Sequence, residues 1–470
     1  MRVLFIYSSW NAPLAYSEGV GLLSAGLKRA GHETKLLYIH KDMYPLHLEG
    51  IKREVEEYQP GLIAFSTGTN QYPIVTQISR FLRPYLSIPF IVGGVHSTLC
   101  PEEVIKETSI DILCLGEGEE AIVELTEGLE SGEDITRIRN LWVKRDGQVF
   151  KNPPRPYQNL DHNPFADRKV FAFQKLIDLK NGWVDMMAGR GCPYLCTFCF
   201  NESYRKIYRS SLGADTGGYI RFRKPSLVIQ EMKEILASYQ CIKTFSFNDD
   251  TFTMSKGWLT EFCSLYEEEI KVPFVINSHL NNVEEDALDV LKDAGCELVR
   301  VGIESGNPRI RNDVLKRHPI SNEEIVDLLG RIQSRGIRVL TYNMIGLPTE
   351  RKEDIIETIR LNARCSPDVV KILTFYPYKN TPIYDFCLRK GLLRPDHEEL
   401  PNYYEKTVLN FDQETKDFIQ DVQTNFCRYL NEYVEGQGIR YEQKFAPYFA
   451  VKVKEDLSEQ FEISLKKELI

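Results

Sequence analysis

The sequence predicts an α/β protein built from two successive arrays of parallel strands and a mostly helical C-terminal region. Short apolar, β-branched runs alternate with helical patterns from the first residue, and the alternation resumes after a proline-rich stretch. The length of 470 residues allows two or three domains, each with its own core. Alternation of this kind is typical of parallel sheets with right-handed crossovers.

The first 145 residues contain five apolar runs separated by helical stretches such as 19–30 and 51–58. The runs span residues 3–7, 34–38, 62–66, 90–92 and 112–115. We expect them to form a Rossmann-like sheet. Because ligands of such sheets bind beyond the carboxyl ends of the strands, we expect a ligand there.

Residues 146–182 are polar and rich in proline, with prolines at positions 153, 154, 156 and 164. This composition indicates a linker between domains with little regular structure.

The second array, residues 183–375, contains six further strand-and-helix units. Strands are expected at 184–187, 244–247, 274–278, 298–303, 339–345 and 369–375, and helices at 226–238, 256–269, 285–294, 322–335 and 352–365. Six units predict a partial (β/α)6 barrel, whose incomplete wall leaves a lateral opening for a large substrate. Residues that follow each strand should face the active site.

The C-terminal residues 376–470 read as helical and rich in aromatic side chains. Aromatic residues at helical spacing are usually part of a core, and a lid that faces the substrate is the alternative. The residues concerned are Tyr403, Tyr404, Phe411, Phe418, Phe426, Tyr429 and Tyr433.

Three cysteines follow the first strand of the second array with the spacing C-x3-C-x2-C: Cys192, Cys196 and Cys199. Three thiolates this close in sequence can hold three corners of an iron–sulfur cubane and leave one iron open to a ligand. Electron-transfer clusters and structural zinc sites normally take four protein ligands. Two alternatives remain. The three cysteines could form a zinc knuckle with a distant fourth ligand, or they could be core cysteines that bind no metal. A noncatalytic iron–sulfur carrier would have to recruit a fourth cysteine, such as Cys241, Cys263 or Cys296.

The bulk composition excludes several classes of protein. A net charge of -9 argues against a nucleic-acid partner. The eleven cysteines are scattered apart from the one cluster, so a reducing, cytoplasmic location is expected. No apolar stretch approaches the roughly 18 residues of a membrane span, and the N-terminal apolar run is too short for a signal peptide.

The cysteine loop resembles the cluster loop of the radical S-adenosylmethionine (SAM) enzymes, in which an aromatic residue precedes the third cysteine. Phe198 occupies that position. The resemblance implies a radical SAM barrel with a [4Fe-4S] cluster held by Cys192, Cys196 and Cys199, and SAM bound to the open iron.

The same resemblance assigns SAM contacts to residues at the ends of other strands. Asp249 and Asp250 would meet the methionine ammonium, and Glu304 would bind the ribose. Leu347 and the backbone of Phe198 would lie against the adenine. The alternative for the three acids is that they are solvated or capping carboxylates.

The strand ends of the first array resemble the cobalamin-binding domain that precedes the barrel in one branch of the radical SAM enzymes. The resemblance rests on the order of Gly93-Gly94-Val95-His96-Ser97-Thr98, Pro101-Glu102-Glu103 and Gly116-Glu117-Gly118-Glu119. It implies that cobalamin is bound by Ser66, Thr67, Gly93, Gly94, His96 and Glu117.

One departure from other B12 proteins concerns the D-x-H-x-x-G motif, which supplies a histidine to cobalt. His47 and Gly50 fit its second half, but Pro45 stands in place of the aspartate. The lower cobalt ligand therefore stays unassigned. Two alternatives are that His96 is a hydrogen-bonded loop residue and that the domain has lost cobalamin binding.

The family resemblance implies a cobalamin-dependent methyltransferase. A 5′-deoxyadenosyl radical would activate an unactivated carbon of a small-molecule or peptide substrate, and methylcobalamin would supply the methyl group. The alternative is a cyclase, oxidase or rearranging enzyme without net methyl transfer. A methylthiotransferase is less favoured, because the N-terminal array has no second set of three cysteines. The sequence assigns no catalytic residue apart from the cofactor ligands.

A locally basic segment follows the cysteine loop in this acidic protein. It contains Arg205, Lys206, Arg209, Arg221, Arg223 and Lys224. Such a segment could bind an acidic flavodoxin or ferredoxin that reduces the cluster, or it could be a solvated surface.

Overall fold

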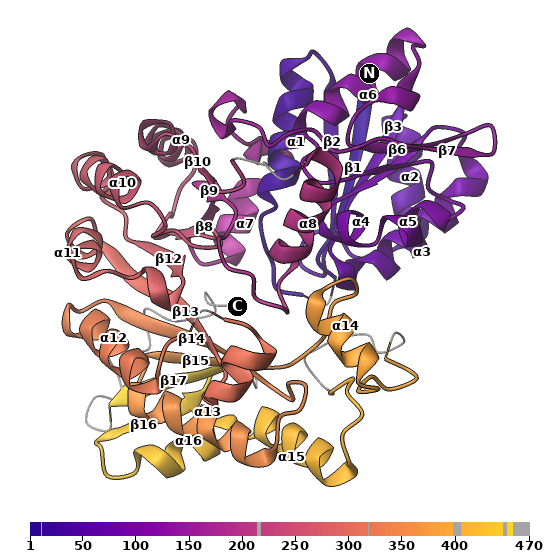
Figure 1. Cartoon of the computed structure of the whole chain (residues 1–470). Helices are drawn as coiled ribbons and strands as arrows, with labels where there is room; N and C mark the ends of the chain where they lie inside the picture. Colours follow the sequence, from indigo (N-terminus) through magenta and orange to yellow (C-terminus); the bar gives the residue numbers. More distant parts are fainter. Residues whose placement is uncertain (11, 214–217, 318, 398–405, 445–448, 455–470) are drawn as a thin grey trace. The chain divides into compact units, whose positions relative to one another are not determined.

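The structure, a computed structural model, describes residues 1–10, 12–213, 218–317, 319–397, 406–444 and 449–454 (Figure 1). The chain divides into two units. The first contains Met1–Leu176 and Ser203–Arg221, and the second contains Ile177–Glu202 and Phe222–Ile470. The four-part division predicted from the sequence stays a prediction.

The first unit contains a seven-stranded sheet in the order β2-β1-β3-β4-β5-β6-β7. Strands β1 to β5 are parallel and correspond to the five predicted runs, whereas antiparallel β6 and β7 were not predicted. The order 2-1-3-4-5 is a doubly wound topology that reverses direction between β1 and β3. The strands are β1 (Arg2–Ser8), β2 (Glu33–Ile39), β3 (Leu62–Ser66), β4 (Phe90–Gly93), β5 (Ile112–Cys114), β6 (Leu141–Arg145) and β7 (Gln148–Lys151).

Helices cover this sheet, and their starts follow ordinary capping chemistry. The Ser17 side chain accepts a hydrogen bond from the Val20 N–H at the start of α1, which satisfies one of the otherwise unpaired N–H groups there. The helices are α1 (Glu18–Arg29), α2 (Leu48–Tyr58), α3 (Tyr72–Leu82), α4 (Val95–Leu99), α5 (Pro101–Lys106), α6 (Glu119–Ser131) and, from Ser203, α8 (Phe200–Leu212).

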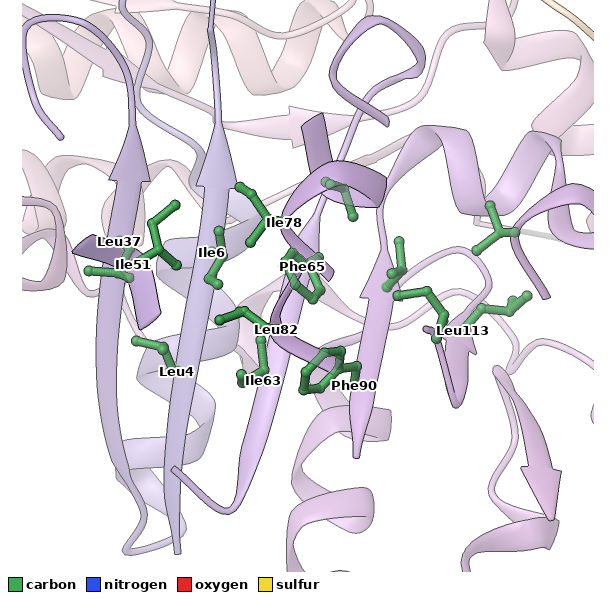
Figure 2. Close-up of a cluster of buried hydrophobic side chains, with 14 of the residues drawn as sticks. Leu4, Ile6, Leu37, Ile51, Ile63, Phe65, Ile78, Leu82, Phe90 and Leu113 are labelled. Atoms are coloured by element: carbon green, nitrogen blue, oxygen red, sulfur yellow. The ribbon is translucent and has the colours of Figure 1, made fainter. Parts of the chain in front are cut away.

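The core of the first unit lies between the parallel strands and helices α2 and α3. Figure 2 shows Ile6, Phe65 and Phe90 of the strands beside Ile78 and Leu82 of α3, all of them buried. Each fully buried side chain of this size contributes roughly 1.5–3 kcal/mol. This packing fixes where the carboxyl ends of the strands lie.

The prediction that residues 146–182 have little regular structure is wrong. They contain strand β7, two short 3-10 turns and helix α7 (Phe173–Leu179). The physical reason is a set of apolar residues inside this polar stretch: the rings of Phe171 and Phe173 are buried against Tyr16.

The second unit confirms the predicted six strand-and-helix units. Its parallel strands are β8 (Trp183–Met186), β11 (Thr244–Phe247), β12 (Phe274–Ser278), β13 (Cys296–Glu304), β14 (Arg338–Ile345) and β15 (Val369–Thr374). The intervening helices are α9 (Pro225–Ser238), α10 (Lys256–Glu269), α11 (Glu285–Asp293), α12 (Asn322–Ser334) and α13 (Lys352–Cys365). Strand β8 ends the sheet order, so the wall is open, as expected for a partial barrel.

The C-terminal region adds α14 (Pro382–Arg389), α15 (Gln413–Thr424) and α16 (Phe426–Val434), and then a hairpin of β16 (Ile439–Gln443) and β17 (Phe449–Lys454). The hairpin was not predicted, and β17 pairs antiparallel with β15. Helices α15 and α16 lie near α13 (Figure 1), and their apolar side chains join its buried cluster.

The core role expected for the C-terminal aromatic residues is confirmed where the structure describes them. Phe426 is fully buried, and Phe411, Phe418, Tyr429 and Tyr433 pack against the same cluster. Tyr403 and Tyr404 lie outside the described residues. In the described part of the chain, no helix has the length and apolar character required to span a membrane.

Candidate cluster and cofactor sites

The three cysteines lie in a loop after β8, and backbone hydrogen bonds anchor this loop to distant segments. The Thr197 N–H donates to the Leu315 carbonyl (2.9 Å), and the Thr197 hydroxyl donates to the Val314 carbonyl (2.7 Å). The Ile383 N–H at the start of α14 donates to the Thr197 carbonyl (3.0 Å). The cysteine loop is therefore held in place on two sides.

Burial makes the three thiols difficult to deprotonate while no cation is bound. Burial raises the pKa of Cys196 to about 11 and that of Cys199 to about 12, and it also raises the pKa of Cys192. Negative charge on Cys196 and Cys192 raises the pKa of Cys199 further. A bound cation reverses this effect, because metal coordination deprotonates thiols.

The sulfur atoms of the three cysteines are not gathered as closely as the ligands of a single zinc ion. Among the described residues, the one group of three candidate ligands whose atoms all lie within 4.8 Å of one another is His96, Cys100 and Glu103. The sulfurs of Cys192, Cys196 and Cys199 are therefore spread more widely. Thiolates that share one tetrahedral zinc lie about 3.8 Å apart, given a Zn–S distance of about 2.3 Å. Cysteine thiolates are also the usual ligands of iron–sulfur clusters.

Asp249 and Asp250, which follow β11, both contact the cysteine loop. The buried Asp249 carboxylate accepts hydrogen bonds from the backbone N–H groups of Ala188 (3.1 Å) and Gly189 (2.5 Å), and burial raises its pKa to about 7. Asp250 accepts hydrogen bonds from the Gly191 backbone and the Asn201 side chain. Asp250 keeps an exposed surface, whereas Asp249 does not. Their role at the methionine ammonium stays a prediction.

Glu304, at the end of β13, is paired with an arginine that sequence reasoning missed. Arg317 Nη1 lies 3.1 Å from Glu304 Oε1, and Arg317 Nη2 donates to the Gly302 carbonyl (2.9 Å). Burial raises the pKa of Glu304, and Arg317 opposes that shift. Arg317 also lowers the pKa of Cys192 and Cys196, so its charge acts on the glutamate and the cysteine loop together.

Phe198 and Leu347, both predicted to lie at the adenine, belong to one apolar cluster that also contains Leu315 and Phe375. The Leu347 N–H donates to the buried Glu350 carboxylate (2.9 Å). Gly346 has a φ of +72°, a conformation that favours glycine. The structure thus brings together two residues that are 149 positions apart.

In the first unit, the loops after β3 and β4 lie close together. The Thr67 N–H donates to the Gly93 carbonyl (3.0 Å), and the His96 N–H donates to the Thr67 carbonyl (3.3 Å). A Cβ on Gly94 would lie 2.5 Å from the Thr67 carbonyl oxygen. Ser66, Gly93 and Gly94 keep solvent exposure although their strands are buried. This narrow, accessible edge made of backbone and small side chains fits a bulky cofactor such as cobalamin.

His96 and Glu117, also predicted to bind cobalamin, have other partners in the structure. His96 is 2% exposed, its ring lies 4.2 Å from that of Tyr72, and Nε2 lies 3.7 Å from a Glu103 carboxylate oxygen. The Glu117 carboxylate forms an ion pair with Arg221 (3.0 Å). The cobalamin roles of these two residues, and of Ser66, Thr67, Gly93 and Gly94, stay predictions.

His47, which fits half of the missing cobalt-ligand motif, caps a helix. Its Nδ1 accepts a hydrogen bond from the Gly50 N–H (3.0 Å) at the start of α2. An N-cap accounts for this histidine without a cofactor.

The interpretation of Arg221 and Arg223 as docking residues is wrong. Their side chains are only 11% and 13% exposed, and they form ion pairs with Glu117 and Glu231. Arginine pairs readily with carboxylates through two parallel hydrogen bonds, so a basic stretch of sequence can be neutralised internally.

Comparison with known proteins agrees with this architecture. Residues 186–361 match the family described as the radical SAM superfamily, and residues 15–126 match the B12 binding domain. An uncharacterized methyltransferase of Pyrococcus horikoshii is 26% identical over 374 residues, covering 78% of this chain and 78% of that protein. The anaerobic magnesium-protoporphyrin IX monomethyl ester cyclase of Synechocystis is 26% identical over 395 residues, covering 80% and 74%.

Among solved structures, the fold resembles the radical SAM methyltransferase TsrM of Kitasatospora setae. The TM-score is 0.66 at 17% identity, covering 84% of this chain and 77% of that one. The matched domains occur in the same order as the two arrays described above, and they include the strand-end glycines of the first array and the cysteine loop of the second. The chain is therefore an enzyme that works with SAM, a [4Fe-4S] cluster and cobalamin, and it belongs to the cobalamin-dependent radical SAM enzyme family.

Proposed function

We propose that this enzyme methylates an unactivated carbon of a small-molecule or peptide substrate. The observation that carries the proposal is the three-cysteine loop at the carboxyl end of the first barrel strand, in a chain that also carries a B12-binding domain. Three cysteines leave one iron open for SAM, and the B12-binding domain supplies a methyl carrier.

The chemistry that the bound cluster, SAM and cobalamin supply is hydrogen abstraction by a 5′-deoxyadenosyl radical and delivery of a methyl group to the resulting carbon radical. The chain's own residues hold the geometry. Asp249 fixes the start of the cysteine loop through Ala188 and Gly189. Arg317 pairs with Glu304 and opposes the rise of its pKa on burial, which favours a charged carboxylate facing the ribose hydroxyls.

The test is anaerobic turnover of the reconstituted enzyme with SAM and a reductant, followed by mass spectrometry. We expect 5′-deoxyadenosine and S-adenosylhomocysteine to accumulate together once substrate is supplied. The matched control is Cys199→Ala, in which a thiolate of the cysteine loop is removed and both products should disappear. Absence of 5′-deoxyadenosine from the intact enzyme would contradict the proposal.

A second candidate is a cyclase, oxidase or rearranging enzyme without net methyl transfer. The observation in its favour is the similarity to the Synechocystis cyclase over 80% of this chain. Formation of 5′-deoxyadenosine without S-adenosylhomocysteine or a methylated product would favour this candidate over the methyltransferase.

We also propose an acidic flavodoxin or ferredoxin as the reductant. What supports this is that Lys206 and Arg209, on one helix of the first unit, keep exposed side chains, whereas Arg221 and Arg223 are paired with carboxylates. Charge reversal at Lys206 and Arg209 should slow turnover driven by flavodoxin and leave turnover driven by dithionite unchanged, because a small reductant needs no docking surface. An equal effect on both would contradict docking.

A further inference from the structure

One level of the interior of the partial barrel is apolar. Trp183, Val275, Leu298, Leu340 and Val369 come from five different strands and form one buried cluster. Side chains on a strand alternate between its two faces. Residues two positions further along each strand therefore also point into the interior, one layer closer to the carboxyl ends.

That next layer is polar on all five strands: Asp185, Asn277, Arg300, Tyr342 and Lys371. The corresponding layers of (β/α) barrels are usually filled by branched apolar residues.

This polar layer also differs from its neighbours in exposure. Asn277, Tyr342 and Lys371 keep partial solvent exposure, whereas the adjoining Ile276 and Ile372, on the opposite strand faces, are fully buried. Three of the five residues of this layer are therefore partly accessible to solvent, whereas Asp185 and Arg300 are buried.

Arg300 carries a buried charge that is held only by neutral groups. It is 9% exposed, and its Nη2 donates to the Phe247 carbonyl (2.8 Å) and to Asn248 Oδ1 (3.3 Å). Its Nε has no hydrogen-bond partner, and within the described residues no carboxylate forms an ion pair with it. A buried guanidinium without a counter-ion is unfavourable unless a ligand supplies the negative charge.

Lys371 places a second cation on the same interior face. Its ammonium lies over the rings of Phe449 (4.9 Å) and Tyr342 (5.7 Å). Burial and, to a smaller extent, the charge of Arg300 together lower the pKa of Lys371 to about 8. Asp185 is already engaged by Lys180 and by the Asn248 side chain (3.1 Å), which also accepts a hydrogen bond from Arg300 (3.3 Å).

We propose that the barrel interior binds an anionic group of the substrate, a carboxylate or a phosphoryl group, through Arg300 and Lys371. The arginine guanidinium can donate two parallel hydrogen bonds to the oxygens of a carboxylate or phosphoryl group, and the lysine ammonium adds a second positive charge. The inference rests on the function proposed above and narrows its substrate class. SAM also carries a carboxylate, so the experiment must separate the two sources.

The probes are inorganic phosphate and acetate, titrated calorimetrically into the reconstituted enzyme with and without SAM. The variants are Arg300→Gln, Arg300→Lys and Lys371→Met. The matched control is Arg137→Gln, which removes the same charge from a side chain that is 91% exposed in the first unit. We expect Arg300→Gln to weaken binding of the probes about tenfold or more, since hydrogen bonds to charged groups are the strong ones. Lys371→Met should weaken it less, and Arg137→Gln should leave it unchanged.

Binding of SAM decides which carboxylate the site takes. If the affinity for SAM is the same in Arg300→Gln and the intact enzyme, and the probes bind in the presence of SAM, the site belongs to the substrate. If SAM displaces the probes and Arg300→Gln weakens SAM to the same extent, the cations bind SAM and the proposal is overturned. Equal affinity of the probes for Arg300→Gln and Arg137→Gln also overturns it.

A negative result for anion binding can be distinguished from a failure of the proposed function. Formation of 5′-deoxyadenosine by the intact enzyme tests the radical chemistry and does not depend on anion binding. If Arg300→Gln does not fold, Arg300→Lys and Lys371→Met carry the test, because both leave a cation in the layer. Unchanged binding of the probes in both would then refute the site.

Discussion

Glu350 is a buried carboxyl group that closes the turn after β14. Its Oε2 accepts the Leu347 N–H (2.9 Å), and burial raises its pKa to about 8. The folded protein therefore binds a proton that the unfolded chain has released at neutral pH. Between an ordinary pKa of about 4.5 and the raised value, stability falls as pH rises, and above about pH 8 the loss is complete.

Glu350→Gln should remove this pH dependence. The amide keeps an oxygen that can accept the Leu347 N–H and cannot ionise. We expect the intact enzyme to lose on the order of a few kcal/mol of stability between pH 5 and pH 9, and the variant to lose clearly less. Unfolding in urea at several pH values measures the difference. Parallel pH profiles for the two proteins would contradict the assignment.

The pair of Glu304 and Arg317 predicts a second effect at the residue scale. Arg317→Met would leave the glutamate buried without its partner, which typically costs about 3–5 kcal/mol. We expect lower stability and weaker SAM binding, the first measured by urea unfolding and the second by equilibrium dialysis.

The double variant Glu304→Gln, Arg317→Met separates the two contributions. Stability should recover in part, because no unpaired charge remains, whereas SAM affinity should stay low. Recovery of both would show that the pair is structural only.

At the scale of elements, the loops after β3 and β4 depend on Gly94. Its φ is +102°, and a Cβ there would lie 2.5 Å from the Thr67 carbonyl oxygen. Gly94→Ala should force the two loops apart and lower the cobalt retained after incubation with hydroxocobalamin and gel filtration. Iron content should not change, since the cysteine loop belongs to the other unit.

Gly68→Ala is the matched control for this substitution. Gly68 lies in the neighbouring loop, and nothing is within 4 Å of a Cβ there. Its cobalt content should equal that of the intact enzyme. Equal cobalt retention by Gly68→Ala and Gly94→Ala would contradict the role given to the loop contact.

The elements that could be predicted are those with a local signal. Strands β11 and β12 were predicted to the residue, because each is an apolar run of strand length bounded by polar turns. The hairpin of β16 and β17 was missed because its first strand is largely polar and its position is set by pairing with β15. Likewise, α7 was hidden in a polar stretch whose few apolar residues find partners only in the folded chain.

At the scale of the whole molecule, the site could be predicted where its residues are contiguous. The spacing of Cys192, Cys196 and Cys199 carries its own chemistry. Arg317 could not be predicted, because its pairing with Glu304 is set by the fold and not by a sequence motif. The bonds from Asp249 to the cysteine loop cross about 60 residues and left no pattern.

Arg300 and Lys371 can be recognised from the sequence as unusual strand residues. Each is a lone cation inside a strand whose other residues are mostly apolar. A charged residue in the middle of a buried parallel strand is costly, so it marks either an ion pair or a ligand.

The proposed function depends on a cysteine loop that leaves one iron open and on a first unit that holds cobalamin. The most direct measurement is the metal content of the enzyme purified and reconstituted without oxygen, together with its SAM binding. We predict about four irons and about one cobalt per chain, and binding of SAM that is lost in Cys199→Ala. Zinc in place of iron, or a cluster to which SAM does not bind, would contradict it.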